Sequence, residues 1–288
     1  MQILFPLPAS IFRLCTPRCQ TTLLRRHESH SPQNADSCLV SALPGALIAS
    51  QPVASNQSAP SQSDRIAQVA APLHTVVLVL LLLAGAALAY FSAGRMRTVP
   101  PTNRVFFYFK TMLWEWFLLA YVLLGVHWHH TSLEEVTGAA WKRARDFFRD
   151  LGIALLFWIL ALFVLVLLAH LLNPRPSVSF LLPQSRLEVF IWILLSTTAG
   201  ICEEAIFRGY LQKQFIAWTG SIPAGLFLSA CIFGLAHIYQ GAKSAVVLGV
   251  FGLMFGILAH RRRSMRPGMI THALHDTATG IVMKFVPK

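Results

Sequence analysis

Long blocks of apolar residues alternate with short polar and basic segments from about residue 73 to the end of the chain. The ranges 75–91 and 151–169 contain no charged residue, and with their flanking residues each is long enough to cross a hydrocarbon layer of about 30 Å. The complete pattern predicts helices at roughly 75–92, 105–126, 151–172, 187–217, 222–239, 244–260 and 268–284. The predicted fold class is therefore all-α, a multi-pass transmembrane helical bundle of about seven helices.

Polar residues between the apolar blocks indicate where several helices begin and end. Pro174 stops the third helix, because the residue before a proline is disfavoured in the α conformation. Ser185 and Glu188 have the spacing of a capping box at the start of the fourth helix. Gly220 suits the end of that helix, and Ser221 suits the N-cap of the next one.

The first 72 residues have a different composition, rich in Ser, Gln, Pro and Ala. Such a segment buries too little apolar surface to offset its ordering entropy, so residues 1–72 are predicted to be a disordered, low-complexity tail. Residues 73–288 then form the membrane domain. Three cysteines lie in the tail and two in predicted helices, a distribution that indicates neither a disulfide framework nor a zinc site.

Composition and charge limit the class of partner. Hydrophobic residues make up 55% of the 288 residues and charged residues 12%, a balance typical of a membrane protein. The net charge is +12, but the basic residues lie in short loops such as 261–266 rather than on one folded face. Lipid headgroups and membrane topology explain this charge better than nucleic acid does, so membrane lipids are expected partners and nucleic acid is not.

Two acids and a base stand out at membrane depth. Glu203, Glu204 and Arg208 follow directly after an apolar run. A charged side chain near the bilayer centre costs about 2.5 to 3.5 kcal/mol on insertion scales, so such groups usually mark a functional site. Glu204 and Arg208 have the i, i+4 order that favours an internal ion pair. Glu203 points about 100° away from Glu204 and is predicted to face a cavity.

Three further polar residues lie in later apolar helices. His237 follows a run of apolar residues in the predicted helix 222–239, and His272 and Asp276 share a face of the helix 268–284. Any one of these histidines alone is more often a hydrogen-bonded core residue than a catalyst. Their joint occurrence with Glu203 favours a shared polar site. Lys110 and Glu115 on the second helix mark either an interfacial tilt or a cavity-facing pair.

The order of these residues resembles a known family. Glu203-Glu204-x-x-x-Arg208, Phe233-x-x-x-His237 and His272-x-x-x-Asp276 are similar to the three motifs of the CPBP intramembrane proteases, which include the type II CAAX prenyl endopeptidases and bacteriocin-immunity relatives. The resemblance covers about residues 187–284. It implies that Glu203 and His237 activate a water, that His272 and Asp276 help to bind the oxyanion, and that Glu204 and Arg208 support them.

Two questions about this site stay open at the level of sequence. Glu203, His237 and His272 could instead hold a divalent metal such as zinc, which would make the protein a metalloprotease. Asp276 donates a hydrogen bond only when protonated, so an orienting or metal-binding role is an alternative to oxyanion binding. His275 lies three residues from His272 and either reaches the same cavity or packs structurally.

The combined prediction is a CPBP-type intramembrane endopeptidase. It would hydrolyse a peptide bond near the membrane surface, in a reaction like CAAX processing, by a Glu- and His-activated water. A peptide or protein is the expected substrate, with prenylated CAAX peptides as one candidate. The alternative is a non-catalytic membrane transporter or scaffold that uses the same Glu, His and Asp groups to bind an ion or a partner. The expected location is integral to a membrane, the plasma membrane of a bacterium.

Overall fold

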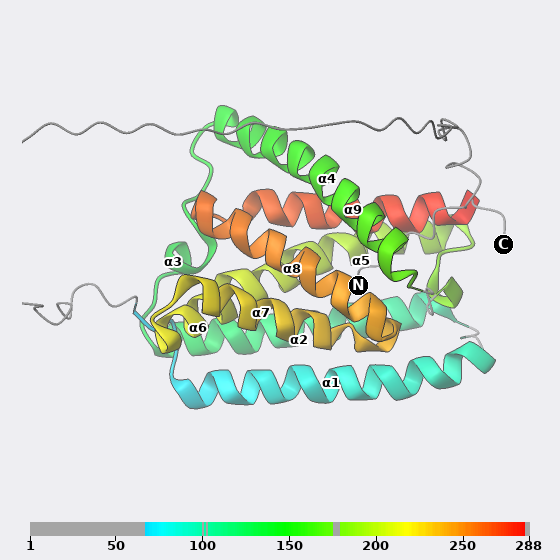
Figure 1. Cartoon of the computed structure of the whole chain (residues 1–288), viewed down its shortest axis with the longest axis horizontal. Helices are drawn as coiled ribbons and strands as arrows, with labels where there is room; N and C mark the ends of the chain where they lie inside the picture. Colours follow the sequence, from blue (N-terminus) through cyan, green and yellow to red (C-terminus); the bar gives the residue numbers. More distant parts are fainter. Residues whose placement is uncertain (1–66, 100, 102, 175–178, 286–288) are drawn as a thin grey trace, which may run out of the picture. The chain divides into compact units, whose positions relative to one another are not determined.

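The computed structural model describes residues 67–99, 101, 103–174 and 179–285, and every regular element among them is helical (Figure 1). The all-α prediction is confirmed, while most of the predicted tail lies outside the described residues. The α-helices are α1 (Pro72–Thr98), α2 (Arg104–Trp128), α3 (Leu133–Thr137), α4 (Ala144–Leu172), α5 (Arg186–Glu204), α6 (Gln212–Thr219), α7 (Ile222–Ala236), α8 (Ala242–Arg262) and α9 (Arg266–Phe285). A π-helix, η4 (Ala205–Leu211), joins α5 to α6, and short 3-10 helices are η3 (Ser179–Leu181) and η5 (Ile238–Gln240).

Each of the seven predicted ranges contains a helix. They correspond to α1, α2, α4, the continuous α5–η4–α6 segment, α7, α8 and α9, and the short α3 is an addition. Five helical segments are long and apolar enough to cross a membrane within the described residues: α1, α2, α4, α5–η4–α6 and α8. The protein is therefore a multi-pass membrane protein. The helix α7 is apolar but shorter than these spans.

The predicted helix ends are confirmed by their backbone geometry. The helix α4 ends at Asn173, which adopts a left-handed conformation with φ of 44° before Pro174. Ser185 and Glu188 form a complete capping box at the start of α5. Gly220 ends α6 with φ of 62°, and the hydroxyl of Ser221 accepts a hydrogen bond from the first turn of α7.

Two details of the prediction were wrong. The range 187–217 was expected to be one α-helix, but its centre is the π-helix η4. Its hydrogen bonds span five residues instead of four, which changes the direction of the side chains after it. The range 222–239 was also too long. The helix α7 stops at Ala236, and His237 is its C-cap with φ of −103° and ψ of 12°. His237 is thus presented from a helix end rather than from a helix face.

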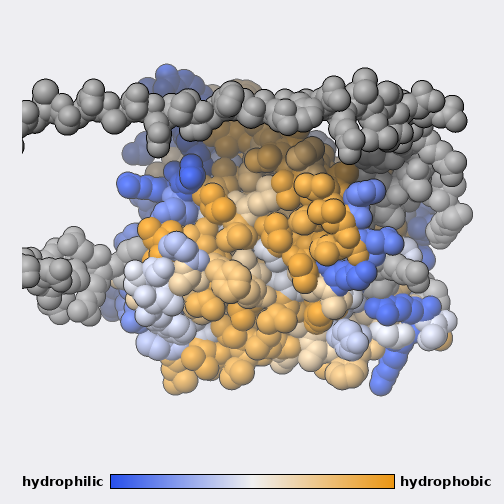
Figure 2. All heavy atoms as spheres, viewed as in Figure 1, coloured by the Kyte–Doolittle hydropathy of each residue, from blue (hydrophilic) through white to orange (hydrophobic). Residues whose placement is uncertain are grey.

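Surface hydropathy follows the direction of the helices. Hydrophobic side chains cover the middle of the helices in Figure 2, and hydrophilic side chains gather at the two ends, left and right in the view. Large apolar side chains such as Leu113, Leu156 and Phe163 are exposed on α2 and α4. A lipid environment makes this exposure favourable, since water-facing apolar surface on this scale is unusual in soluble proteins.

Close packing of α5 against α9 fixes the frame of the polar site. A side chain at Gly200 on α5 would meet the backbone of α9, at 2.8 Å from the carbonyl oxygen of Met269 and 3.0 Å from the nitrogen of Ala273. Further along α9, Gly280 lies against the indole of Trp192. The indole Nε1 of Trp192 donates to the carbonyl oxygen of Asp276 at 2.9 Å. These contacts fix the position of α9 along the axis of α5.

The packed part of the chain begins before the predicted boundary at residue 73. The backbone nitrogen of Val69 donates to Oε1 of Gln214 at 2.9 Å, and Nε2 of Gln214 donates to the carbonyl oxygen of Ala70 at 2.8 Å. All three residues are buried. The segment just before α1 is therefore fastened to α6.

Candidate active site

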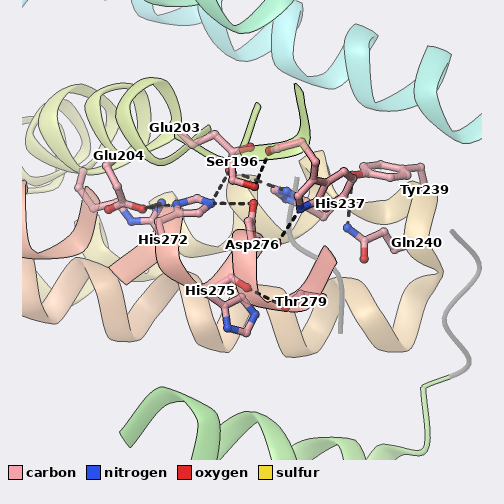
Figure 3. A network of polar contacts seen from close by, with 12 residues as sticks. Ser196, Glu203, Glu204, His237, Tyr239, Gln240, His272, His275, Asp276 and Thr279 are labelled. Carbon is pink, nitrogen blue, oxygen red and sulfur yellow. Dashed lines mark hydrogen bonds and ion pairs between the residues drawn. The ribbon is translucent and has the colours of Figure 1, made fainter. Parts of the chain in front are cut away.

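The predicted site residues converge from α5, η4, α7 and α9 (Figure 3). Glu203 and Glu204 end α5, His237 caps α7, and two residues of α9 face them. All of them are buried, and the set is Glu203, Glu204, Arg208, His237, His272 and Asp276. Residues separated by up to 73 positions in the sequence thus share one polar cluster inside a helical bundle.

Glu204 and Arg208 form the predicted internal ion pair. Oε1 of Glu204 lies 3.1 Å from NH1 of Arg208, and both side chains are fully enclosed. The guanidinium also donates from NH2 to the carbonyl oxygen of Gly252 at 3.2 Å and lies over the ring of Phe233 at 4.4 Å from its centroid. Charge pairing, a carbonyl acceptor and an aromatic face together compensate for burying this cation.

His272 is held by the same carboxylate. Its Nδ1 lies 3.0 Å from Oε1 of Glu204. A carboxylate accepts rather than donates, so Nδ1 carries a proton in this contact. The other ring nitrogen, Nε2, faces Oε2 of Glu203 at 3.7 Å and Oδ2 of Asp276 at 3.8 Å. Glu204 therefore sets the orientation of the imidazole towards Glu203.

His237 has the complementary arrangement. Its Nδ1 donates to the carbonyl oxygen of Phe233 at 2.8 Å, because a carbonyl can only accept. In the neutral ring, Nε2 then carries a lone pair. This atom lies 3.8 Å from Oε2 of Glu203. The cap position of His237 at the end of α7 allows the ring to turn back towards its own helix and still face α5.

A cavity of about 350 Å³ adjoins the cluster. Its walls come from α1, α2, η3, the α5–η4 junction and the segment after α7, and they are mainly apolar. Glu203 and His237 line it, whereas His272 and Asp276 do not and lie behind Glu203. Leu88 lines the cavity and is 69% exposed, so the cavity reaches the outer surface of α1.

Residues 185–278 match the family model named Rce1-like and described as type II CAAX prenyl endopeptidase Rce1-like. Over this segment the chain is similar to the Rce1-like family. The resemblance inferred from the three motifs is thereby confirmed, since the matched range contains all six residues of the cluster. No curated protein and no solved structure matches this chain. The helices α1 and α2 precede the matched segment and contribute much of the cavity wall.

The residues of the matched segment do not fit a metal centre as they are placed. Within the part of the chain that the structure describes, no group of three or more His, Cys, Asp or Glu side chains has an arrangement that could hold a metal ion. The zinc alternative therefore finds no support in the placement of these side chains.

The structure also resolves the position of His275. Its ring is buried and packs against Phe251 of α8, with 5.2 Å between the ring centroids. In Figure 3 it lies on the side of α9 away from Glu203, and it is not among the residues lining the cavity. Packing in the core is the role that its position supports.

Sequence reasoning missed one contributor to the site and left the direction of another open. Trp192 fixes the backbone of Asp276, and nothing in the sequence distinguishes this indole from the others. Glu115 was noticed, but its direction was left open. Both Glu115 and Lys110 line the cavity, without an ion pair between them in the described structure. The cavity-facing alternative is therefore correct for both, although they are not partners.

Proposed function

We propose that this protein is an intramembrane endopeptidase in which Glu203 and His237 activate a water that hydrolyses a peptide bond near the membrane surface. The observation that supports this most is the pair of acceptors at one cavity wall. Oε2 of Glu203 and Nε2 of His237 are 3.8 Å apart, and both residues line the cavity. One water can lie within hydrogen-bond distance of both atoms.

A water in this position donates one hydrogen to each acceptor and directs an oxygen lone pair into the cavity. As it attacks the carbonyl carbon of the substrate, its proton moves to Glu203 and the carbonyl oxygen becomes an oxyanion. Collapse of this intermediate breaks the C–N bond, and the proton on Glu203 passes to the leaving nitrogen. The products are a new carboxyl terminus and a new amine, with Glu203 returned to its starting form.

Support for the oxyanion comes from His272 in this proposal. With Nδ1 engaged by Glu204, His272 donates from Nε2 only as an imidazolium. The carboxylates of Glu203, Glu204 and Asp276 lie around the ring, at 3.7, 3.0 and 3.8 Å from its nitrogens. Because His272 lies behind Glu203, it also orients this carboxylate. Asp276 either orients the ring of His272 or, when Asp276 itself is protonated, donates a hydrogen bond to the oxyanion.

The substrate proposed is a membrane-associated peptide or protein. The name of the matched family points to prenylated CAAX peptides, and a mainly apolar cavity between lipid-facing helices suits a substrate that approaches from the membrane. A bacterial plasma membrane stays the expected location.

Reconstituted vesicles test this function against a transporter or scaffold. Purified protein and Glu203→Gln are incorporated into vesicles, and hydrolysis of quenched fluorescent peptides, with and without a prenyl group, is measured beside ion flux. The proposal expects hydrolysis by the parent, at least about 100-fold less by the variant, and equal flux in both. Ion flux that depends on Glu203, without hydrolysis, would establish the rival function.

A further inference from the structure

Glu115 is a second acid in the cavity that holds the proposed reaction centre. It lies on α2, outside the matched segment, and lines the cavity together with Glu203 and His237. It is buried, since only 7% of the residue is exposed. Its Oε2 has no hydrogen-bond partner among the described residues.

No cation of the described chain compensates Glu115. Lys110 lines the same cavity but is exposed, and it forms no ion pair with Glu115. Arg208 is paired with Glu204, at 3.1 Å between NH1 and Oε1. An enclosed carboxylate oxygen with no partner among the described residues is costly, and inside a membrane such a group usually serves a ligand or a pathway. A ligand that enters the cavity could supply that partner.

The walls of the cavity indicate the shape of that partner. They are built mainly from apolar side chains, among them Leu82, Ala86, Leu118 and Phe207. A ligand that satisfies both features has an apolar stem and a cationic tip. Lysine and arginine side chains have this form, because their methylene groups pack on apolar surface while the charged end reaches a polar group.

We propose that Glu115 is a specificity-determining residue that binds a lysine or arginine side chain close to the scissile bond of the peptide substrate. This inference rests on the proposed function. The position follows from the shared cavity, since a side chain that reaches Glu115 enters the same cavity as the bond that Glu203 and His237 attack. Two carboxylates in one cavity disfavour an acidic side chain at the same place.

A binding experiment tests the proposal without requiring hydrolysis. The full chain carrying Glu203→Gln is placed in nanodiscs and titrated into a dye-labelled dodecapeptide of alanine and norleucine. In the series of peptides, a single lysine replaces norleucine at each position in turn, and a matched series carries glutamate there. Fluorescence anisotropy gives Kd for each peptide. The same titrations are made with Glu203→Gln/Glu115→Gln, and with Glu203→Gln/Glu134→Gln as a control for loss of an acid outside this cavity.

We expect one or two lysine positions to lower Kd about tenfold or more relative to norleucine, and glutamate at those positions to raise it. Glu115→Gln should remove the lysine preference and leave the norleucine peptide unchanged, while Glu134→Gln keeps the preference. Equal Kd values across the series, no binding of any peptide, or a lysine preference that survives Glu115→Gln would overturn the proposal. Should Glu115→Gln fail to fold, the lysine and glutamate series on Glu203→Gln still decides. Parent hydrolysis, measured separately, reports on the proposed function itself.

Discussion

Glu204 fixes the imidazole of His272 through a contact of 3.0 Å between Oε1 and Nδ1. The neighbouring Glu203 approaches the opposite nitrogen of the same ring, at 3.7 Å. Two consecutive carboxylates thus act on the two sides of one histidine, because successive side chains of a helix diverge by about 100°. Glu204 belongs to a buried ion pair, which suits a supporting role. Glu203 lines the cavity, which suits the proposed catalytic role.

Stability should therefore respond differently to the two glutamates. Glu204→Gln leaves Arg208 enclosed without its counter-charge and weakens the contact to His272, and breaking such a pair costs about 3 to 5 kcal/mol. Glu203→Gln keeps the shape of a residue at the cavity wall and should change stability little. Thermal unfolding of both variants in detergent, beside the parent, checks this difference. Equal melting temperatures of the two variants would show that the ion pair is not a main support of the fold.

The close approach of α5 and α9 gives a second prediction. Gly200→Ala places a methyl group 2.8 Å from the carbonyl oxygen of Met269, so the helices must separate, at a cost of about 1 to 3 kcal/mol. Gly152→Ala is the matched control, because a methyl group there meets nothing within 4 Å and alanine favours a helix. The parent and both variants are compared by thermal unfolding and by peptide hydrolysis. Unchanged stability and activity in Gly200→Ala would contradict the tight interface.

The helical framework could be predicted from the sequence because each element has a local physical signal. The uncharged run within α4 indicates the length of that helix. Pro174 marks the end of α4, Ser185 marks the start of α5, and Gly220 ends α6. The pairing of Glu204 with Arg208 was likewise visible in their spacing, and the structure has it at 3.1 Å.

The remaining features depend on tertiary structure. The π-helix over Ala205–Leu211 has no signature of its own, since its side chains suit an α-helix equally well. No local pattern marks the end of α7 at Ala236, so the placement of His237 as its C-cap was not predicted. The direction of Glu115 is set by the packing of α2 against α5, which no local pattern reports.

Asp276→Asn separates two roles for this residue. If Asp276 donates to the oxyanion, the amide should keep or raise activity above neutral pH, because it donates without needing a proton. If its negative charge holds His272, with 3.8 Å between Oδ2 and Nε2, activity should fall about 10- to 100-fold, the usual effect of a supporting partner. We expect the fall, because Oδ2 of Asp276 faces Nε2 of His272, the ring that the proposed mechanism uses.

The measurement is the pH profile of Asp276→Asn against the parent, each with and without a chelator. Activity equal to or above that of the parent at high pH would contradict the charge-holding role. Loss of parent activity with the chelator would direct attention back to a metal.

The segment before α1 predicts a sharp boundary for truncation. Removing residues 1–66 should leave membrane insertion and activity unchanged, because none of the site residues and none of the described contacts is removed. Removing residues 1–70 should lower stability by about 1 to 3 kcal/mol, since the enclosed amide of Gln214 loses its bonds to Val69 and Ala70. Membrane fractionation and thermal unfolding compare the two truncations. Equal stability of both would show that this anchor contributes nothing.

The central claim is that Glu203 makes the protein a peptidase, and it is tested most directly by the peptides that the protein generates in its own membrane. Cells lacking the gene are complemented with the parent or with Glu203→Gln at equal membrane abundance, and new amino termini in the membrane fraction are identified by mass spectrometry. We predict a set of cleavage products that is present with the parent and absent with Glu203→Gln. The same products at the same abundance in both would contradict the claim.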